Sequence, residues 1–271
     1  MAGSLTDYLL LNYDRHALYD RPDWYDFDYI GYKAEAPFYH GVIERGMSEG
    51  QVFVELGAGS GRLLQDLLRA KVKCHAVEPN IHMLKACQKM ARELSAIEVF
   101  SSECAKAHDF LGPPEDPVGF IAFPFNGLLH IHTLAELNEA LQHVFQRLPP
   151  GGLFACDIMA PAWEVMEVGS VEWGRLDERV SPQTGEPVWT YDRCRFEPAT
   201  HLMHSELRFI EEGASRGVEL YYAQRMWTYQ ELLGALHHAG FGVEEIYGDV
   251  DFAAFDENSP RLLVLAQKPE G

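Results

Sequence analysis

One stretch, QVFVELGAGSGR at residues 51–62, constrains the fold of this chain most strongly. Its apolar run VFVEL predicts a strand buried on both faces, and the run RLLQDLLRA that follows predicts the start of a helix. Three glycines alternate between them, at Gly57, Gly59 and Gly61. Glycine allows positive φ and a close approach to a ligand, and a helix N-terminus directs free N–H groups toward the same place. The stretch therefore predicts a ligand-binding turn between a strand and a helix.

Arg62 argues against a dinucleotide in this turn. The dinucleotide pattern G-x-G-x-x-G needs a small residue at this position, because helix and strand pack closely there. Glu55, at the end of the predicted strand, would repel a phosphate and attract a cation. An NAD(P)-dependent Rossmann oxidoreductase is therefore the less favoured alternative.

Glu55 and the three glycines resemble the first motif of the class I S-adenosylmethionine-dependent methyltransferases. This resemblance implies S-adenosyl-L-methionine as the cofactor, whose methionine end carries an ammonium and a sulfonium. It also implies an α/β fold, a Rossmann-like sheet with helices on both faces. A catalytically inactive protein that binds the same cofactor as a regulatory or scaffold subunit is the alternative from another class.

Further cofactor contacts follow along the chain. Glu78 ends the predicted strand KVKCHAVEPN, 23 residues after Glu55, and one strand–helix–strand unit would place both acids at the same sheet edge. An acid there can accept hydrogen bonds from both ribose hydroxyls. By resemblance, Met83 lies against the adenine, although it could equally fill the core. Glu103 and Cys104, after the predicted strand AIEVF, match the adenine-edge position, where the family more often shows Gly-Asp.

The string FPFNGLLHIH, residues 123–132, is similar to F-N-x-L-x-H in small-molecule N- and O-methyltransferases. His130 falls on the family's histidine, and its ordinary pKa of about 6.5 suits proton removal from an acceptor. The apolar strand brings Asn126 and His132 to the sheet edge where open parallel sheets bind ligands, so both are candidate substrate contacts. Phe123 is a candidate cofactor contact. The string does not match the N/D-P-P-Y tetrad of DNA amino-methyltransferases.

Two more regions contribute candidates. Asp157 ends the predicted fifth strand, GGLFACDIM, and is a candidate substrate contact. The Tyr-rich N-terminal segment resembles a lid over the cofactor, in which Tyr29 is a candidate catalytic residue and Tyr32 a candidate cofactor contact. A helix is predicted at residues 34–45.

The chain is predicted to have four parts. Residues 1–46 form an aromatic arm or lid, and residues 47–160 form the cofactor-binding core. Residues 161–227 form an inserted meander of three antiparallel strands, interpreted as a cap or a homodimer element. Residues 228–271 add a helix and a strand hairpin that complete the core. Capping boxes are predicted at Thr133–Glu136 and Thr228–Glu231.

Composition narrows the partners. A formal charge of −19 and a pI near 4.9 oppose binding to nucleic acid or to an anionic membrane. No run approaches the roughly 18 apolar residues of a membrane span, so a cytoplasmic protein is expected. Five scattered cysteines, without a C-x-x-C pair, indicate neither a disulfide framework nor a metal site. The sequence thus predicts a methyltransferase that acts on a nitrogen or oxygen of a small molecule.

Overall fold

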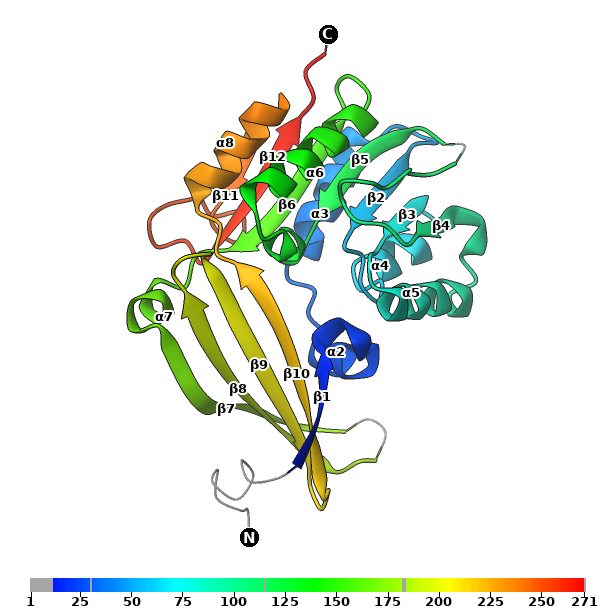
Figure 1. Ribbon diagram of the computed structural model, residues 1–271. Coiled ribbons are helices and arrows are strands. Elements are labelled where there is room, and N and C mark those ends of the chain that lie inside the picture. The colour runs from blue at the N-terminus through cyan, green and yellow to red at the C-terminus, as the bar shows by residue number, and fades with distance from the viewer. Residues whose placement is uncertain (1–11, 30, 115, 182–183, 271) are drawn as a thin grey trace. The chain divides into compact units, whose positions relative to one another are not determined.

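The computed structural model describes residues 12–29, 31–114, 116–181 and 184–270. Two compact units make up the chain: Met1–Asp28 with Ala162–Met226, and Tyr29–Pro161 with Trp227–Gly271. Figure 1 shows the second unit as a sheet flanked by helices and the first as a mainly β structure. The predicted arm at residues 1–46 contributes to both units, and its residues 1–11 and 30 lie outside the described residues.

A seven-stranded sheet forms the centre of the larger unit, in the order β11-β12-β6-β5-β2-β3-β4. Strands β2 to β6 are parallel, and β12 and β11 close the sheet in antiparallel pairs. This topology confirms the predicted Rossmann-like fold and its closing strand hairpin. The strands are β2 (Val52–Leu56), β3 (Cys74–Val77), β4 (Phe100–Glu103), β5 (Val118–Phe123), β6 (Leu153–Met159), β11 (Gly242–Tyr247) and β12 (Arg261–Gln267).

Helices cover both faces of this sheet (Figure 1). Three of them share one buried core with alternate strand residues such as Phe53, Phe120 and Ala155. Phe154 precedes Ala155 and so points to the opposite face, where it contacts Phe241 after the last helix. The first three helices are α3 (Ala36–Gly46), α4 (Leu64–Arg69) and α5 (Ile81–Glu93), and the opposite face carries α6 (Leu134–Arg147) and α8 (Tyr229–Ala239), which pack against each other.

The start of the strand after α5 differs from the prediction. The run AIEVF was expected to be extended, but Ile97–Val99 forms a 3-10 turn (η2) in which Val99 N donates to Ala96 O at 3.1 Å. Strand β4 begins only at Phe100. The β-branched residues that suggested a strand instead belong to the turn that leads into it, because local propensity is weaker than tertiary context.

Five strands form the sheet of the smaller unit, in the order β1-β10-β9-β8-β7. The three antiparallel strands predicted here are present as β8 (Pro187–Glu197), β9 (Leu202–Glu211) and β10 (Arg216–Arg225). Sequence reasoning missed β7 (Ser170–Val180) and the helix α7 (Trp163–Val168) before it. Two register shifts interrupt the pairing of β7 with β8, so its polar and apolar residues do not alternate cleanly.

The N-terminal residues add an edge and a cover to this sheet. Strand β1 (Asn12–Ala17) pairs in parallel with β10, and a short turn, η1 (Leu18–Asp20), leads to α2 (Pro22–Tyr29). Trp24 and Phe27 of α2 pack on Phe209, with ring centroids 4.8 and 6.1 Å apart. The helix escaped sequence analysis because it is only 8 residues long and shows no apolar period. Across the described ranges, no helix has the length and apolar character needed to cross a membrane.

Both predicted capping boxes are present. In the second, Thr228 Oγ1 accepts from Glu231 N at 3.3 Å, and Glu231 Oε2 accepts from Thr228 N at 2.9 Å. These bonds satisfy N–H groups that the helix itself leaves without a partner.

We expect Thr228→Ala to lower the free energy of unfolding by about 1 kcal/mol, because α8 would lose its N-terminal cap. Urea denaturation of the two proteins measures this difference. Thr228→Ser is the matched control, since it keeps the hydroxyl, and it should stay close to the wild type. Equal losses in both variants would contradict the assigned cap.

Candidate active site

The order of the parallel strands reverses between β2 and β5. From β2 the chain continues to β3 and β4 on one side of the sheet, whereas β5 and β6 lie on the other side of β2. In open parallel sheets, ligands bind at such a reversal, outside the carboxyl ends of the strands. The predicted site residues lie in the larger unit, mostly at or just after these ends. The site is therefore described within this unit.

The glycine turn follows β2 directly and has a left-handed backbone. The φ angles of Gly57, Gly59 and Gly61 are 64°, 58° and 91°, which only glycine adopts without strain. A Cβ on Gly57 would lie 3.1 Å from the Phe123 ring, and one on Gly61 would lie 2.9 Å from Cys87 Sγ and collide with Met90. The turn therefore has the positive φ angles that the glycine pattern predicted, and its backbone lies close to the neighbouring side chains.

Glu78 closes the turn from the next strand. Its Oε2 accepts from Gly59 N at 2.9 Å, and its Oε1 accepts from Asn80 N at 2.8 Å. Burial raises the pKa of Glu78, and these two N–H groups oppose that rise. The structure thus brings two predicted cofactor contacts, Gly59 and Glu78, into direct contact. Each carboxylate oxygen keeps a further lone pair for another donor.

Glu55 is a buried carboxylate beside the turn. Only 3% of the residue is exposed, and its Oε2 has no hydrogen-bond partner among the residues that the structure describes. Burial raises the pKa of Glu55 well above the ordinary value, and Arg62 opposes this while Glu35 and Glu78 reinforce it. A buried oxygen without a donor is costly, so this position is prepared for a cation or a donor group.

Sequence reasoning did not foresee the role of Arg62. Its guanidinium pairs with the fully buried carboxylate of Glu35 and donates to Tyr32 O. It also lies 4.2 Å from the centroid of the Phe125 ring, a cation–π distance. The unusual arginine after the third glycine was the available signal, because a charge at a position that normally packs closely needs a buried partner.

Phe125 makes aromatic contacts with both predicted tyrosines, Tyr29 and Tyr32. Its ring centroid lies 5.5 Å from that of Tyr29 and 5.2 Å from that of Tyr32. Burial raises the pKa of Tyr32, and Arg261 opposes that rise from a position 5.6 Å from the Tyr32 ring centroid. No site role was predicted for Phe125, although it begins the F-N-x-L-x-H string, or for Arg261, which lies at a strand start.

Asn126 and Asp157, both predicted to contact substrate, bind the protein itself in this structure. Asp157 is fully buried, and its Oδ1 accepts from Tyr39 Oη at 2.6 Å and from Phe125 N at 2.7 Å. Its Oδ2 lies 3.2 Å from the guanidinium of Arg261. Asn126 Oδ1 accepts from Met159 N at 2.6 Å. A substrate contact by either residue stays a prediction and would have to share these oxygens.

Further candidates are Met83, Phe123, His130 and His132. Met83 is fully buried, and its Cε lies 3.4 Å from the place where a Cβ on Gly59 would stand. Phe123 is 8% exposed and ends β5. His130 ends the 3-10 turn η3 (Gly127–His130), and His132 follows two residues later, both half-buried.

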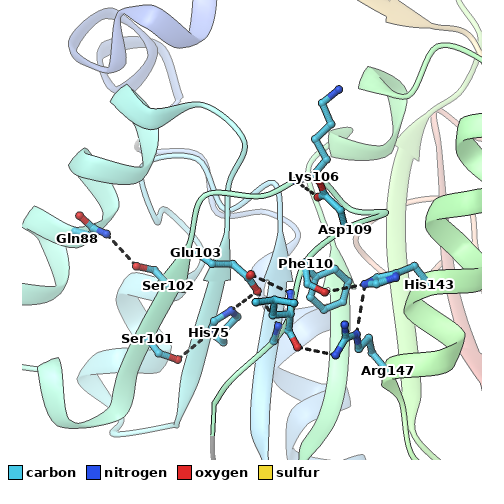
Figure 2. Close-up of polar contacts among 12 residues, drawn as sticks. His75, Gln88, Ser101, Ser102, Glu103, Lys106, Asp109, Phe110, His143 and Arg147 are labelled. Carbon is cyan, nitrogen blue, oxygen red and sulfur yellow. Dashed lines mark hydrogen bonds and ion pairs between the residues drawn. The ribbon is translucent and has the colours of Figure 1, made fainter.

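Glu103 and Cys104 are less favourably placed than the sequence suggested. Figure 2 shows the Glu103 carboxylate directed at His75, with Nε2 and Oε1 2.9 Å apart. The same carboxylate accepts from Leu111 N and Gly112 N at 2.9 and 2.8 Å. Burial alone would raise the pKa of Glu103, but these N–H groups and His75 outweigh it and lower the pKa. An adenine contact by Glu103 would compete with this loop, and Cys104 is exposed with Sγ 3.5 Å from Pro79 O.

The His75 ring fixes the position of the Glu103 carboxylate through a hydrogen bond. His75 is buried, and burial lowers its pKa, so the ring is neutral near pH 7. Its Nδ1 lies 2.7 Å from Ser101 Oγ on β4 (Figure 2). A neutral ring that donates from Nε2 to Glu103 accepts from Ser101 at Nδ1. This arrangement ties β3, β4 and the loop after β4 together.

Comparison with known proteins finds similarity to methyltransferases. Residues 53–152 match a family model described as a methyltransferase domain. A curated relative, an uncharacterized methyltransferase of Geobacillus kaustophilus, is 36% identical over 105 residues, which is 38% of this chain and 44% of that protein. The chain thus aligns with less than half the length of this relative.

Solved structures share the fold over most of the chain. The CcbJ methyltransferase of Streptomyces caelestis has a TM-score of 0.75 at 19% identity, covering 88% of this chain and 89% of that one. A methyltransferase dependent on S-adenosylmethionine from Clostridium acetobutylicum has a TM-score of 0.74 at 16% identity, covering 93% and 96%. The sugar N-methyltransferase KedS8 from Streptoalloteichus has 0.69 at 18%, covering 97% of each chain. These likenesses confirm the predicted fold.

Glu55 offers a test of the buried charge through pH. Because its pKa is raised in the folded protein, the stability that Glu55 contributes is present below the ordinary pKa of 4.5 and is lost as pH rises toward the raised value. In the cofactor-free protein, Glu55→Gln should therefore gain stability over the wild type as pH rises above 4.5. The slope should approach about 1.4 kcal/mol per pH unit for one proton.

Urea denaturation at a series of pH values measures this difference. Glu44→Gln is the control, because Glu44 is an exposed acid on α3. A pH-independent difference for Glu55→Gln would show that the Glu55 carboxylate is not strained by burial.

Proposed function

We propose that this chain, whose residues 53–152 match a methyltransferase domain, is an S-adenosylmethionine-dependent enzyme of class I. Its reaction transfers a methyl group to a nitrogen or oxygen of a small molecule. The observation that carries this proposal is the left-handed glycine turn with the buried carboxylates of Glu55 and Glu78 beside it. A match to part of the chain and a shared fold support the proposal, and the solved sugar N-methyltransferase makes a small-molecule acceptor the favoured class.

The residues around the turn fit the proposed cofactor. Its methionine end is cationic, and Glu55 supplies a buried oxygen without a donor in the described structure. Glu78 has free lone pairs beside Gly59 for ribose hydroxyls, and the soft thioether of Met83 lies under the turn, where it suits a flat ring. A phosphate would meet the buried acids Glu55 and Glu78 here, and Arg62 is already paired with Glu35, which argues against a dinucleotide.

When bound, the cofactor supplies an already activated methyl group on a sulfonium. The chain then has to hold the acceptor in line with that group and remove a proton from it. Positioning can contribute roughly 7–11 kcal/mol to the lowering of such a barrier, and general base catalysis contributes about 10²–10⁴-fold. In this proposal, the rings of Tyr29 and Phe125 shape the acceptor side, and His130 accepts the proton.

His130 lies on a turn whose conformation the structure fixes from both ends. At its start, Leu129 N donates to Asn126 O at 2.9 Å. At its end, Ile131 N donates to Leu128 O at 3.1 Å, and Ile131 O accepts from Trp227 Nε1 at 3.1 Å. Trp227 is fully buried. A histidine on so well-anchored a turn, directly after a strand that ends at the proposed site, is placed well for acid–base work.

We expect His130→Ala to lower turnover by about 10²–10⁴-fold because the general base would be lost. The dissociation constant for S-adenosylmethionine should stay within about twofold, because the imidazole is proposed to act on the acceptor. Steady-state kinetics with an amine or hydroxyl acceptor and calorimetry with the cofactor give the two values. His238→Ala, on the exposed end of α8, is the matched control and should keep both. Unchanged turnover in His130→Ala would reject the assignment.

A further inference from the structure

Glu35 is a buried acid to which no role has yet been assigned. It precedes α3, and the residue is 0% exposed. One of its oxygens, Oε1, pairs with Arg62. The other, Oε2, is buried without a hydrogen-bond partner among the residues that the structure describes. Half of this carboxylate is therefore satisfied and half is not.

The second unsatisfied acid interacts with the first. Glu55 Oε2 is likewise buried without a described partner, and Glu35 raises the pKa of Glu55 through repulsion between the two carboxylates. The two carboxyl groups therefore interact electrostatically with each other. Each one presents a single free oxygen in it.

One cation is shared by these acids. Arg62 pairs with Glu35 and lowers the pKa of Glu55, while Glu78 acts on Glu55 with the same sign as Glu35. Two nitrogens of Arg62 are already used, by Glu35 and by Tyr32 O. Among the residues that the structure describes, Arg62 is the cation found to act on Glu55, and the acids Glu35 and Glu78 act on Glu55 with the opposite sign. Around Glu55, acids therefore outnumber cations.

A ligand that offsets this excess of acids must bring both charge and donors. Burying a carboxylate oxygen without a hydrogen bond is costly, so a cation with N–H groups would be bound strongly. An ammonium has three N–H donors, enough to serve one oxygen on each of two acids. A sulfonium carries charge but has no N–H, so it cannot satisfy these oxygens.

We propose that Glu35 and Glu55 together bind the α-ammonium of the cofactor's methionine end, with Arg62 holding Glu35 in place. This inference rests on the proposed function, since it names the part of the cofactor that these residues bind. It makes Glu35 a cofactor-binding residue, and it gives Arg62 a positioning role after the glycine turn.

Calorimetry with three related ligands tests the assignment. S-adenosylmethionine has the ammonium and the sulfonium, S-adenosylhomocysteine has only the ammonium, and 5′-methylthioadenosine has neither. Glu35→Gln should weaken binding of the first two by the same factor, about 10- to 100-fold, which is the size of a lost hydrogen bond to a charged group. Its affinity for 5′-methylthioadenosine should equal that of the wild type.

Two further variants control for nonspecific effects of charge removal and for unfolding. Glu44→Gln, an exposed acid on α3, should bind all three ligands like the wild type. The double variant Glu35→Gln/Arg62→Met removes both partners of the ion pair. It replaces the single variant in the test if the unpaired charge of Arg62 makes the single variant unfold. If Glu35 binds the ammonium, the double variant should still bind S-adenosylhomocysteine weakly while keeping its affinity for 5′-methylthioadenosine.

Each other outcome overturns the assignment. Unchanged binding of S-adenosylhomocysteine, an equal loss for 5′-methylthioadenosine, or recovery in the double variant would show that Glu35 serves only the fold or Arg62. A loss confined to S-adenosylmethionine would assign Glu35 to the sulfonium instead. If the wild type binds neither adenosyl amino acid, the proposed function itself fails. Normal binding without turnover would remove only the catalytic part of that function.

Discussion

A group of buried acids beside a glycine turn is the constraint on which the proposed site depends. Glu55 and Glu78 are each at most 6% exposed, and Glu35 is fully buried, yet Arg62 is the cation that pairs with this group. Such an arrangement lowers the stability of the cofactor-free protein and favours whatever brings positive charge. A cationic ligand that binds these acids would therefore raise the free energy of unfolding of the protein.

The proposed acceptor side has a different basis, because a buried acid holds a strained turn there. Phe125 and Asn126 both have positive φ, 53° and 62°, which is uncommon for residues other than glycine and costs of order 1–3 kcal/mol each. Asp157 holds this turn through Phe125 N and through its own carbonyl, which accepts from Asn126 N at 3.1 Å. In this conformation, the Phe125 ring lies next to Arg62 and to both tyrosines.

Much of this architecture could be predicted from the sequence because its signals are local. Glycines that need positive φ, capping boxes and apolar strand runs appear as short patterns, and they led correctly to the fold and to the turn. Interactions between distant residues leave no such pattern. Glu35 meets Arg62 across 27 positions, and Asp157 meets Tyr39 across 118. For that reason the internal partners of Asp157 were not foreseen, and its contact with a substrate stays a prediction. Glu103 is a similar case, since nothing near it in the sequence indicates that His75 binds it.

The central claim is that the turn holds a cation-bearing adenosyl cofactor and no pyrophosphate. Its most direct test is the melting temperature of the wild-type protein at pH 7.5, with and without a saturating concentration of S-adenosylhomocysteine or NAD⁺. A ligand that binds only the folded state at about 100 times its dissociation constant adds about 2.7 kcal/mol of stability. The account predicts a rise of several degrees with S-adenosylhomocysteine and none with NAD⁺. A rise with NAD⁺ and none with S-adenosylhomocysteine would contradict it.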